Sequence, residues 1–270
     1  MAWRNWLATR AWAKRDAAAP SDQISTLLDT ARAAADAGDF ERALAIWSEL
    51  AHAGIARAQN NIGACFSRGW GVEKDMALAI RWLTLAVEGG DHAAEFNLAQ
   101  LYFHGEDVER DYERAATLYR RAAEAGNVSA QDMLSMMLID ATVIPPDYAE
   151  ARRWAEAAAG QGVADAMARM GLIYHEGLGV ERDPRLAAEW WAKAAERGQT
   201  WAQTMLGAAF HLGAGVPKDP VASYALLLRA QAGGSELAPA YMRAVLRDLN
   251  PVEQAEAEAR AALPLPEPGS

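Results

Sequence analysis

Residues 166–201 read AMARMGLIYHEGLGVERDPRLAAEWWAKAAERGQTW, and this stretch decides the fold because the chain repeats its pattern. The 36-residue spacing recurs without an insertion, and alanine opens six successive segments: Ala58, Ala94, Ala130, Ala166, Ala202 and Ala238. A fixed period of about 20 to 50 residues is typical of stacked supersecondary units, each of which buries its apolar face against a neighbour. The sequence therefore predicts a repeat array.

The first dozen residues of each segment predict an amphipathic helix, called helix A. Positions 5 and 9, counted from the opening alanine, are apolar in five segments, as at Met170 and Tyr174. With position 1 they have the spacing of one helix face. Position 12 is glycine in four of the five segments, which is typical of a left-handed C-terminal cap. These glycines are Gly69, Gly105, Gly177 and Gly213.

A second helix, called helix B, is predicted after a loop in every segment. Position 18 is aspartate five times and is followed twice by proline, a pattern typical of an N-cap and the first helical residue. These aspartates are Asp75, Asp111, Asp147, Asp183 and Asp219. Position 33 is glycine five times, at Gly90, Gly126, Gly162, Gly198 and Gly234, and closes helix B. We interpret the aspartates as caps and not as metal ligands, because capping accounts for each one locally.

These motifs resemble the Sel-one-like repeat family, which is related to the tetratricopeptide repeats but has a longer inter-helix loop. The resemblance implies an all-α fold, a right-handed superhelical α-solenoid of antiparallel helix pairs, with five 36-residue repeats in residues 58–237. Residues 22–57 resemble a tetratricopeptide-like helix pair, and residues 238–263 are predicted to form C-terminal capping helices. Residues 1–21 form a basic, tryptophan-rich N-terminal segment, and residues 264–270 are expected to be a disordered tail.

Two helices are expected within the C-terminal cap. The first covers residues 239–249. Asn250-Pro251-Val252-Glu253 is a capping signal, and it predicts a short, polar final helix that extends to about Leu263.

Composition limits the partners and the chemistry. The net charge of −10 and a pI near 5.0 argue against nucleic acid as the main partner. The single cysteine, Cys65, lies next to the apolar stripe of its helix, so we expect a buried, unreactive thiol. Some secreted members of the resembled family carry a cysteine pair in each repeat and are linked to penicillin binding and β-lactam hydrolysis. This chain lacks those pairs, which argues against that activity and against an oxidising compartment.

The N-terminal segment leaves two main interpretations open. It contains no apolar run of seven or more residues, so we expect neither a secretory signal nor a membrane span, and a cytoplasmic protein. Residues 1–16 are nevertheless basic and carry Trp3 and Trp6 on one helical face. The segment either docks onto the first repeat or a partner, or makes weak contact with an anionic membrane surface; disorder is a third alternative.

Nothing in the sequence predicts catalysis, a cofactor or a bound metal. Phosphate-binding, nucleophile-elbow, zinc-protease and dinucleotide motifs are absent in a suitable context. His104, His175 and His211 fall near the end of helix A in their repeats. Neighbouring repeats would place them about 10 Å apart, too far for a shared zinc ion, so we interpret them as part of a polar groove lining.

A groove for a partner is predicted by transferring the tetratricopeptide pattern to positions 3, 7, 10 and 11 of helix A and to the residue before it. These positions vary between repeats, whereas positions 5 and 9 do not. The predicted partner-binding residues are Arg57, Asn60, Arg68, Phe96, Gln100, Phe103, His104, Asp132, Met136, Asp165, His175, Glu176, Trp201 and His211. Among them Phe96, Phe103 and Trp201 are candidate aromatic anchors, with packing against an adjacent repeat as the alternative.

The resemblance implies a non-catalytic protein–protein interaction scaffold or adaptor. A preformed groove would receive a partner protein or peptide at little ordering cost to the receptor. The alternatives are a membrane-peripheral assembly factor that uses residues 1–16, and a cell-wall or β-lactam hydrolase by analogy with the cysteine-rich relatives.

Overall fold

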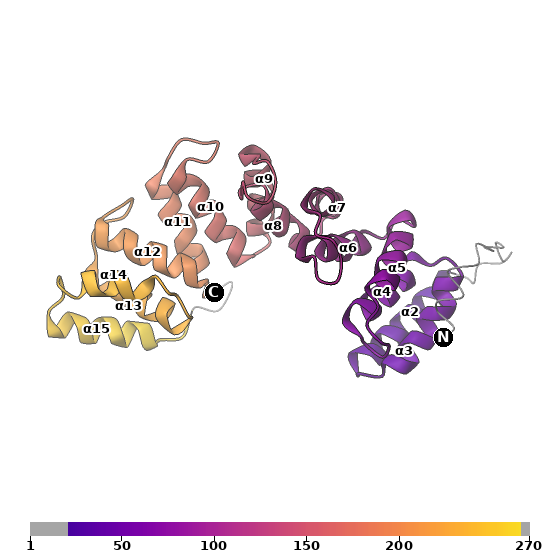
Figure 1. The fold of residues 1–270 in the computed structure, drawn as a ribbon. Helices are drawn as coiled ribbons and strands as arrows, with labels where there is room; N and C mark the ends of the chain where they lie inside the picture. Colours follow the sequence, from indigo (N-terminus) through magenta and orange to yellow (C-terminus); the bar gives the residue numbers. More distant parts are fainter. Residues whose placement is uncertain (1–20, 266–270) are drawn as a thin grey trace. The chain divides into compact units, whose positions relative to one another are not determined.

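A computed structural model describes residues 21–265, and the predictions for residues 1–20 and 266–270 lie outside this range. Every regular element of the described range is a helix, and the all-α prediction is confirmed (Figure 1). The chain divides into two compact units, the first ending at Ala130 and the second beginning at Gln131.

The first unit contains three helix pairs. One helix pair, at the place of the predicted tetratricopeptide-like pair, precedes two repeats, each with a helix A followed by a helix B. These helices are α2 (Ser21–Asp36), α3 (Phe40–His52), α4 (Ala56–Arg68), α5 (Met76–Glu88), α6 (His92–His104) and α7 (Tyr112–Glu124). The closest packing joins the two helices of one repeat, α4 with α5 and α6 with α7.

The second unit continues the alternation and ends in two further helices. The unit boundary falls within α8 (Val128–Met137). The following helices are α9 (Tyr148–Gly160), α10 (Ala164–Glu176), α11 (Pro184–Ala195), α12 (Thr200–Leu212), α13 (Pro220–Ala232), α14 (Ala238–Val245) and α15 (Pro251–Ala262). Here too the helices of one repeat pack most closely, α10 with α11 and α12 with α13.

The predicted helix caps are confirmed at both kinds of boundary. Each position-18 aspartate accepts a hydrogen bond from the backbone N–H three residues later, as Asp75 does from Leu78 at 3.0 Å. The glycines that follow helix A adopt positive φ, for example 73° at Gly69. Both motifs satisfy backbone groups that a helix end leaves without a partner.

Helix A and helix B of one repeat approach closely at position 6. A Cβ added to Gly63 would lie 2.7 Å from Cγ of Leu83, and one added to Gly171 would overlap the indole ring of Trp191. Ser135 takes this position in the third repeat and is fully buried. Small residues at position 6 therefore permit the pairing of the two helices.

The C-terminal cap agrees with the prediction in one helix and differs in the other. Helix α15 begins with the predicted capping box, in which Asn250 and Glu253 exchange side-chain to backbone hydrogen bonds. Helix α14 ends at Val245 and not at residue 249 as predicted. The chain after Val245 tightens into a turn in which Asp248 N–H donates to the Val245 carbonyl at 2.9 Å. The three-residue spacing of that bond ends the α-helix before Asn250 caps the next one.

No helix between residues 21 and 265 is long and apolar enough to cross a membrane.

Candidate binding surface on the A helices

Neighbouring A helices of the first unit are joined by a row of side-chain amides. Asn97, at position 4 of α6, donates from Nδ2 to Oδ1 of Asn60, at position 3 of α4, at 2.8 Å. Asn60 in turn donates to Oδ1 of Asn61 at 3.2 Å. Asn60 is buried, whereas Asn61 and Asn97 are half-buried. Position 3 of one repeat therefore contacts position 4 of the next.

The second unit uses the same two positions for an ion pair. Arg169, at position 4 of α10, donates to the carboxylate of Asp132, at position 3 of α8, at 2.5 Å, and to the hydroxyl of Ser135 at 2.9 Å. The side chains of Arg169 and Asp132 are only 14% and 19% exposed. Asp132 was predicted to contact a partner, and here its charge is neutralised within the repeat array.

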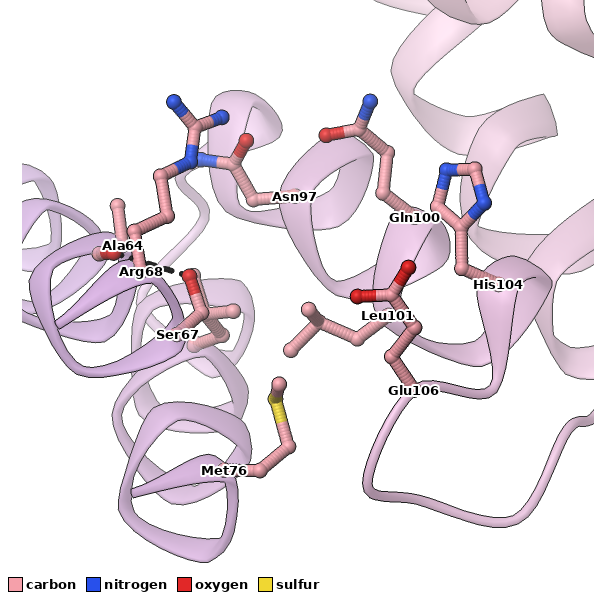
Figure 2. Close-up of a pocket in the computed structure, with 10 residues that line it drawn as sticks. Ala64, Ser67, Arg68, Met76, Asn97, Gln100, Leu101, His104 and Glu106 are labelled. Atoms are coloured by element: carbon pink, nitrogen blue, oxygen red, sulfur yellow. Dashed lines mark hydrogen bonds between the residues drawn. The ribbon is translucent and has the colours of Figure 1, made fainter. Parts of the chain in front are cut away.

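A pocket of about 240 Å³ lies between α4, α5 and α6 in the first unit (Figure 2). Its lining consists of Ala64, Ser67, Arg68, Met76, Leu83, Asn97, Gln100, Leu101, His104 and Glu106. Three of these residues, Arg68, Gln100 and His104, belong to the predicted groove. They stand at positions 7 and 11, so the pocket combines these positions of consecutive A helices.

One lining residue, Arg68, packs against an exposed aromatic ring. The Arg68 guanidinium lies 4.6 Å from the centre of the Trp70 ring, and Trp70 stacks on Phe40 at 5.5 Å between ring centres. Trp70 remains 40% exposed. On the loops nearby, Lys74 Nζ and Asp107 Oδ2 form an ion pair at 2.8 Å, and this contact raises the pKa of Lys74.

The three candidate aromatic anchors are half-buried and pack on helix B side chains. Phe96 lies 5.7 Å from Tyr119 between ring centres, and Phe103 lies 5.5 Å from Tyr112. Trp201 meets Trp191 edge-on at 5.9 Å. Repeat packing therefore uses part of each ring, and a role of the remaining surface as a partner anchor stays a prediction.

The other predicted groove residues differ in how much of each side chain is buried or in contact with a neighbour. Arg57, Asp165 and Glu176 are exposed, and Met136 is half-buried. The His175 ring packs against Trp191 at 5.2 Å between ring centres, and His211 Nδ1 lies 3.6 Å from Asp248 Oδ2. Contact of these residues with a partner stays a prediction.

Two buried ionisable groups of the first unit, Cys65 and Glu95, have surroundings that explain their burial by packing and pairing and not by a reaction. Cys65 is buried, as expected, and burial raises its pKa to about 11, which opposes thiolate formation. The Glu95 carboxylate is 1% exposed and pairs with Arg121 at 2.6 Å and with His92 at 3.0 Å. Between residues 21 and 265, no group of three or more His, Cys, Asp or Glu side chains has an arrangement that could hold a metal ion.

A family model described as Sel1 repeat matches residues 56–91, 92–127, 128–163, 164–199 and 202–235. The chain belongs to the Sel1 repeat family. This confirms the predicted resemblance and the repeat solenoid, and Sel1 repeats generally serve as non-catalytic scaffolds for protein–protein interaction.

Two solved structures are similar to this Sel1 repeat chain. One is a protective antigen of uropathogenic Escherichia coli that displays an SLR fold, with 26% identity, a TM-score of 0.78 and 88% of this chain covered. This chain spans 52% of that antigen's length. The other is a Sel1 repeat protein from Oxalobacter formigenes, with 27% identity, a TM-score of 0.75, and 90% of this chain and 99% of that chain covered. No curated protein matches the sequence.

Three residues of this Sel1 repeat surface were not predicted from the sequence: Asn97, Arg169 and Trp70. Position 4 was not assigned to the groove, although it is polar in three repeats, at Asn61, Asn97 and Arg169, and directly follows the predicted groove position 3. Trp70 was overlooked because most tryptophans in a repeat protein are core residues. Its place directly after the helix-ending Gly69 was the available signal for exposure.

Proposed function

We propose that this Sel1 repeat protein is a non-catalytic scaffold or adaptor that binds a partner protein or peptide on the surface of its A helices. The pocket between α4 and α6 is the observation that carries the proposal. It combines a cation and side-chain amides, at positions 4, 7 and 11 that vary between repeats, with apolar side chains such as Met76 and Leu101. Such a mixture suits recognition of a polypeptide, which presents main-chain and apolar groups together.

The proposal includes a cytoplasmic location, supported by the absence of the cysteine pairs that secreted relatives carry. It does not depend on a membrane contact by residues 1–16, which lie outside the described residues.

Site-specific photo-crosslinking tests the proposed function. A benzophenone amino acid replaces Gln100 in the pocket or, as a control, the exposed Thr117 on helix B of the same repeat. In cells that express the protein natively, we expect a defined adduct from position 100 and none from position 117. The captured protein, once purified, should bind the wild-type chain more tightly than a Gln100→Ala variant. Adducts only from position 117, or from neither position, would contradict the proposal.

A further inference from the structure

The pocket between α4 and α6 presents three kinds of chemical group in a small volume. Arg68 at the end of α4 supplies a guanidinium, and Asn97 and Gln100 on α6 supply amides. Met76 and Leu101 point toward each other in Figure 2 and supply the apolar part of the lining. About 240 Å³ is room for one or two amino-acid residues and not for a folded element.

Much of the polar capacity of this pocket is not used inside the protein. Within the described residues Arg68 forms no ion pair, and its contact is the face of Trp70. Stacking of a guanidinium on a ring leaves the N–H groups at its edge able to donate. The Gln100 side chain has no hydrogen-bond partner between residues 21 and 265. Asn97 donates to Asn60, which leaves its second N–H and its carbonyl oxygen available.

The charges of the pocket are arranged asymmetrically. Glu106 and Arg68 lie on opposite sides of the Leu101 side chain in Figure 2. The ion pair between Lys74 and Asp107 connects the loop that carries Glu106 to the loop after α4. A ligand carboxylate is therefore attracted toward Arg68 and repelled from Glu106, which gives a bound peptide one preferred direction.

We propose that this pocket binds the C-terminal residue of an extended partner peptide. The terminal carboxylate accepts hydrogen bonds from Arg68, the main chain pairs with the amides of Asn97 and Gln100, and an apolar last side chain packs on Met76 and Leu101. This proposal rests on the proposed scaffold function and names the part of the partner that the first unit recognises.

A free C-terminus fits these three groups better than other peptide ligands do. An internal aspartate or glutamate carries a carboxylate but no apolar side chain on the same residue. A helical segment has already used its main-chain donors and acceptors, so the amides would find nothing to pair with. A carboxylate bound by a guanidinium forms charge-assisted hydrogen bonds, which are stronger than neutral ones.

Matched synthetic peptides test the proposal. The probes are fluorescein-labelled Gly-Ser-Gly-Ser-Ala-Z peptides, in which Z is Ala, Val, Leu, Met, Phe, Asp or Lys, each made as a free acid and as a carboxamide. Fluorescence anisotropy with the full chain should show binding of free acids that end in an apolar residue. Because a carboxamide cannot form the charged hydrogen bonds, its affinity should be about 10-fold lower or more than that of the matching free acid.

Two exposed arginines of the first unit supply the matched control. Arg68→Gln should reduce the ratio of acid to amide affinity to about one, whereas Arg42→Gln, on α3 and outside both the pocket and the predicted groove, should leave it unchanged. Circular dichroism checks that both variants keep the helical content of the wild type.

Several results would overturn this proposal. They are equal affinity of the wild type for free acid and carboxamide, an unchanged acid-to-amide affinity ratio in Arg68→Gln, an equal fall of that ratio in both variants, and no binding by any peptide. If no peptide binds while the photo-crosslinked partner still depends on Gln100, the C-terminal specificity is wrong and the scaffold function stands. If the crosslink also fails, both are wrong.

Discussion

The first and second units use one pair of helix positions in opposite ways. Asn60 and Asn97 form a neutral amide contact in the first unit, whereas Asp132 and Arg169 form a shielded ion pair in the second. The amide contact leaves donors and acceptors beside an open pocket. The ion pair saturates its own charges and is completed by Ser135. The same backbone framework can therefore present a surface that is available to a ligand or one that is internally satisfied.

This comparison separates two classes of position. Positions 1 and 5 of helix A are buried in the repeats of both units. Positions 3 and 4, where neighbouring A helices meet, carry different polar residues in the two units. Packing requires only that these polar groups have hydrogen-bonding or charged partners. Four measurements, in order of decreasing expected effect, test that distinction.

Truncation of a position-5 side chain should have the largest effect and should be alike in both units. Ile62→Ala in the first unit and Leu206→Ala in the second remove buried side chains and leave cavities. Each should lower the free energy of unfolding by about 2–5 kcal/mol. Urea unfolding followed by circular dichroism measures this. Trp201→Ala, at a half-buried ring, should cost less than Leu206→Ala, and an equal loss would show that Trp201 is a core residue.

Breaking the lateral contact should cost more in the second unit than in the first. Arg169→Ala leaves the mostly shielded Asp132 carboxylate without its cation and should cost about 1–3 kcal/mol. Asn97→Ala removes a neutral hydrogen bond and should cost about 0.5–1.5 kcal/mol. The same unfolding assay compares them. The double variant Asp132→Leu, Arg169→Met should recover much of the loss. Equal losses in Arg169→Ala and Asn97→Ala would contradict the comparison.

The close approach of helices A and B should tolerate a methyl group less well at Gly171 in the second unit than at Gly63 in the first. In Gly171→Ala the new methyl group meets the rigid Trp191 ring, and the net cost should be about 1–2 kcal/mol. In Gly63→Ala it meets Cγ of the buried Leu83 at 2.7 Å and the Ala79 carbonyl oxygen at 3.2 Å, and the gain in helix propensity should offset part of this milder strain. Melting temperatures of the two variants measure the difference. A larger loss for Gly63→Ala would show that Leu83 is held rigidly.

Ionisation of the Cys65 thiol should change the free energy of unfolding only at alkaline pH, and because Cys65 lies in the first unit, the change concerns that unit. Burial raises its pKa from 9.0 to about 11, so between these values the unfolded chain ionises first. The stabilisation is complete below pH 9 and is lost as pH rises through 11. The free energy of unfolding should therefore fall more steeply over this range in the wild type than in Cys65→Ala.

Thiol labelling supplies the second-unit control for that measurement. Ellman's reagent should react slowly with folded wild-type protein. Ile173→Cys in the Cys65→Ala background places a thiol at the matching, buried position 8 of the second unit. It should be equally protected, and rapid labelling at either position would show that its unit opens locally.

Local interactions explain how much of the fold could be predicted from the sequence. The aspartate N-caps and the glycine ends of helix A depend on contacts within a few residues, so Asp75 and Gly69 could be assigned without coordinates. The end of α14 could not, because Leu249 carries an apolar side chain that continues the helical pattern while the backbone already turns at Val245. Arg68, Gln100 and His104 were placed in a groove by analogy of position, whereas Asn97 and Trp70 were missed.

The repeat, the helix pairs and the apolar core positions could be predicted from the residues alone, because a 36-residue period and a helical stripe are properties of one chain segment after another. Which polar side chains bond to a neighbouring repeat, and which keep free donors or acceptors, depends on the packed fold. Asn60 and Asp132 share position 3, yet one joins an amide row and the other an ion pair. Their state depends on the side chain brought against them by the next repeat, 37 residues along the chain, and that contact exists only after the helices have packed.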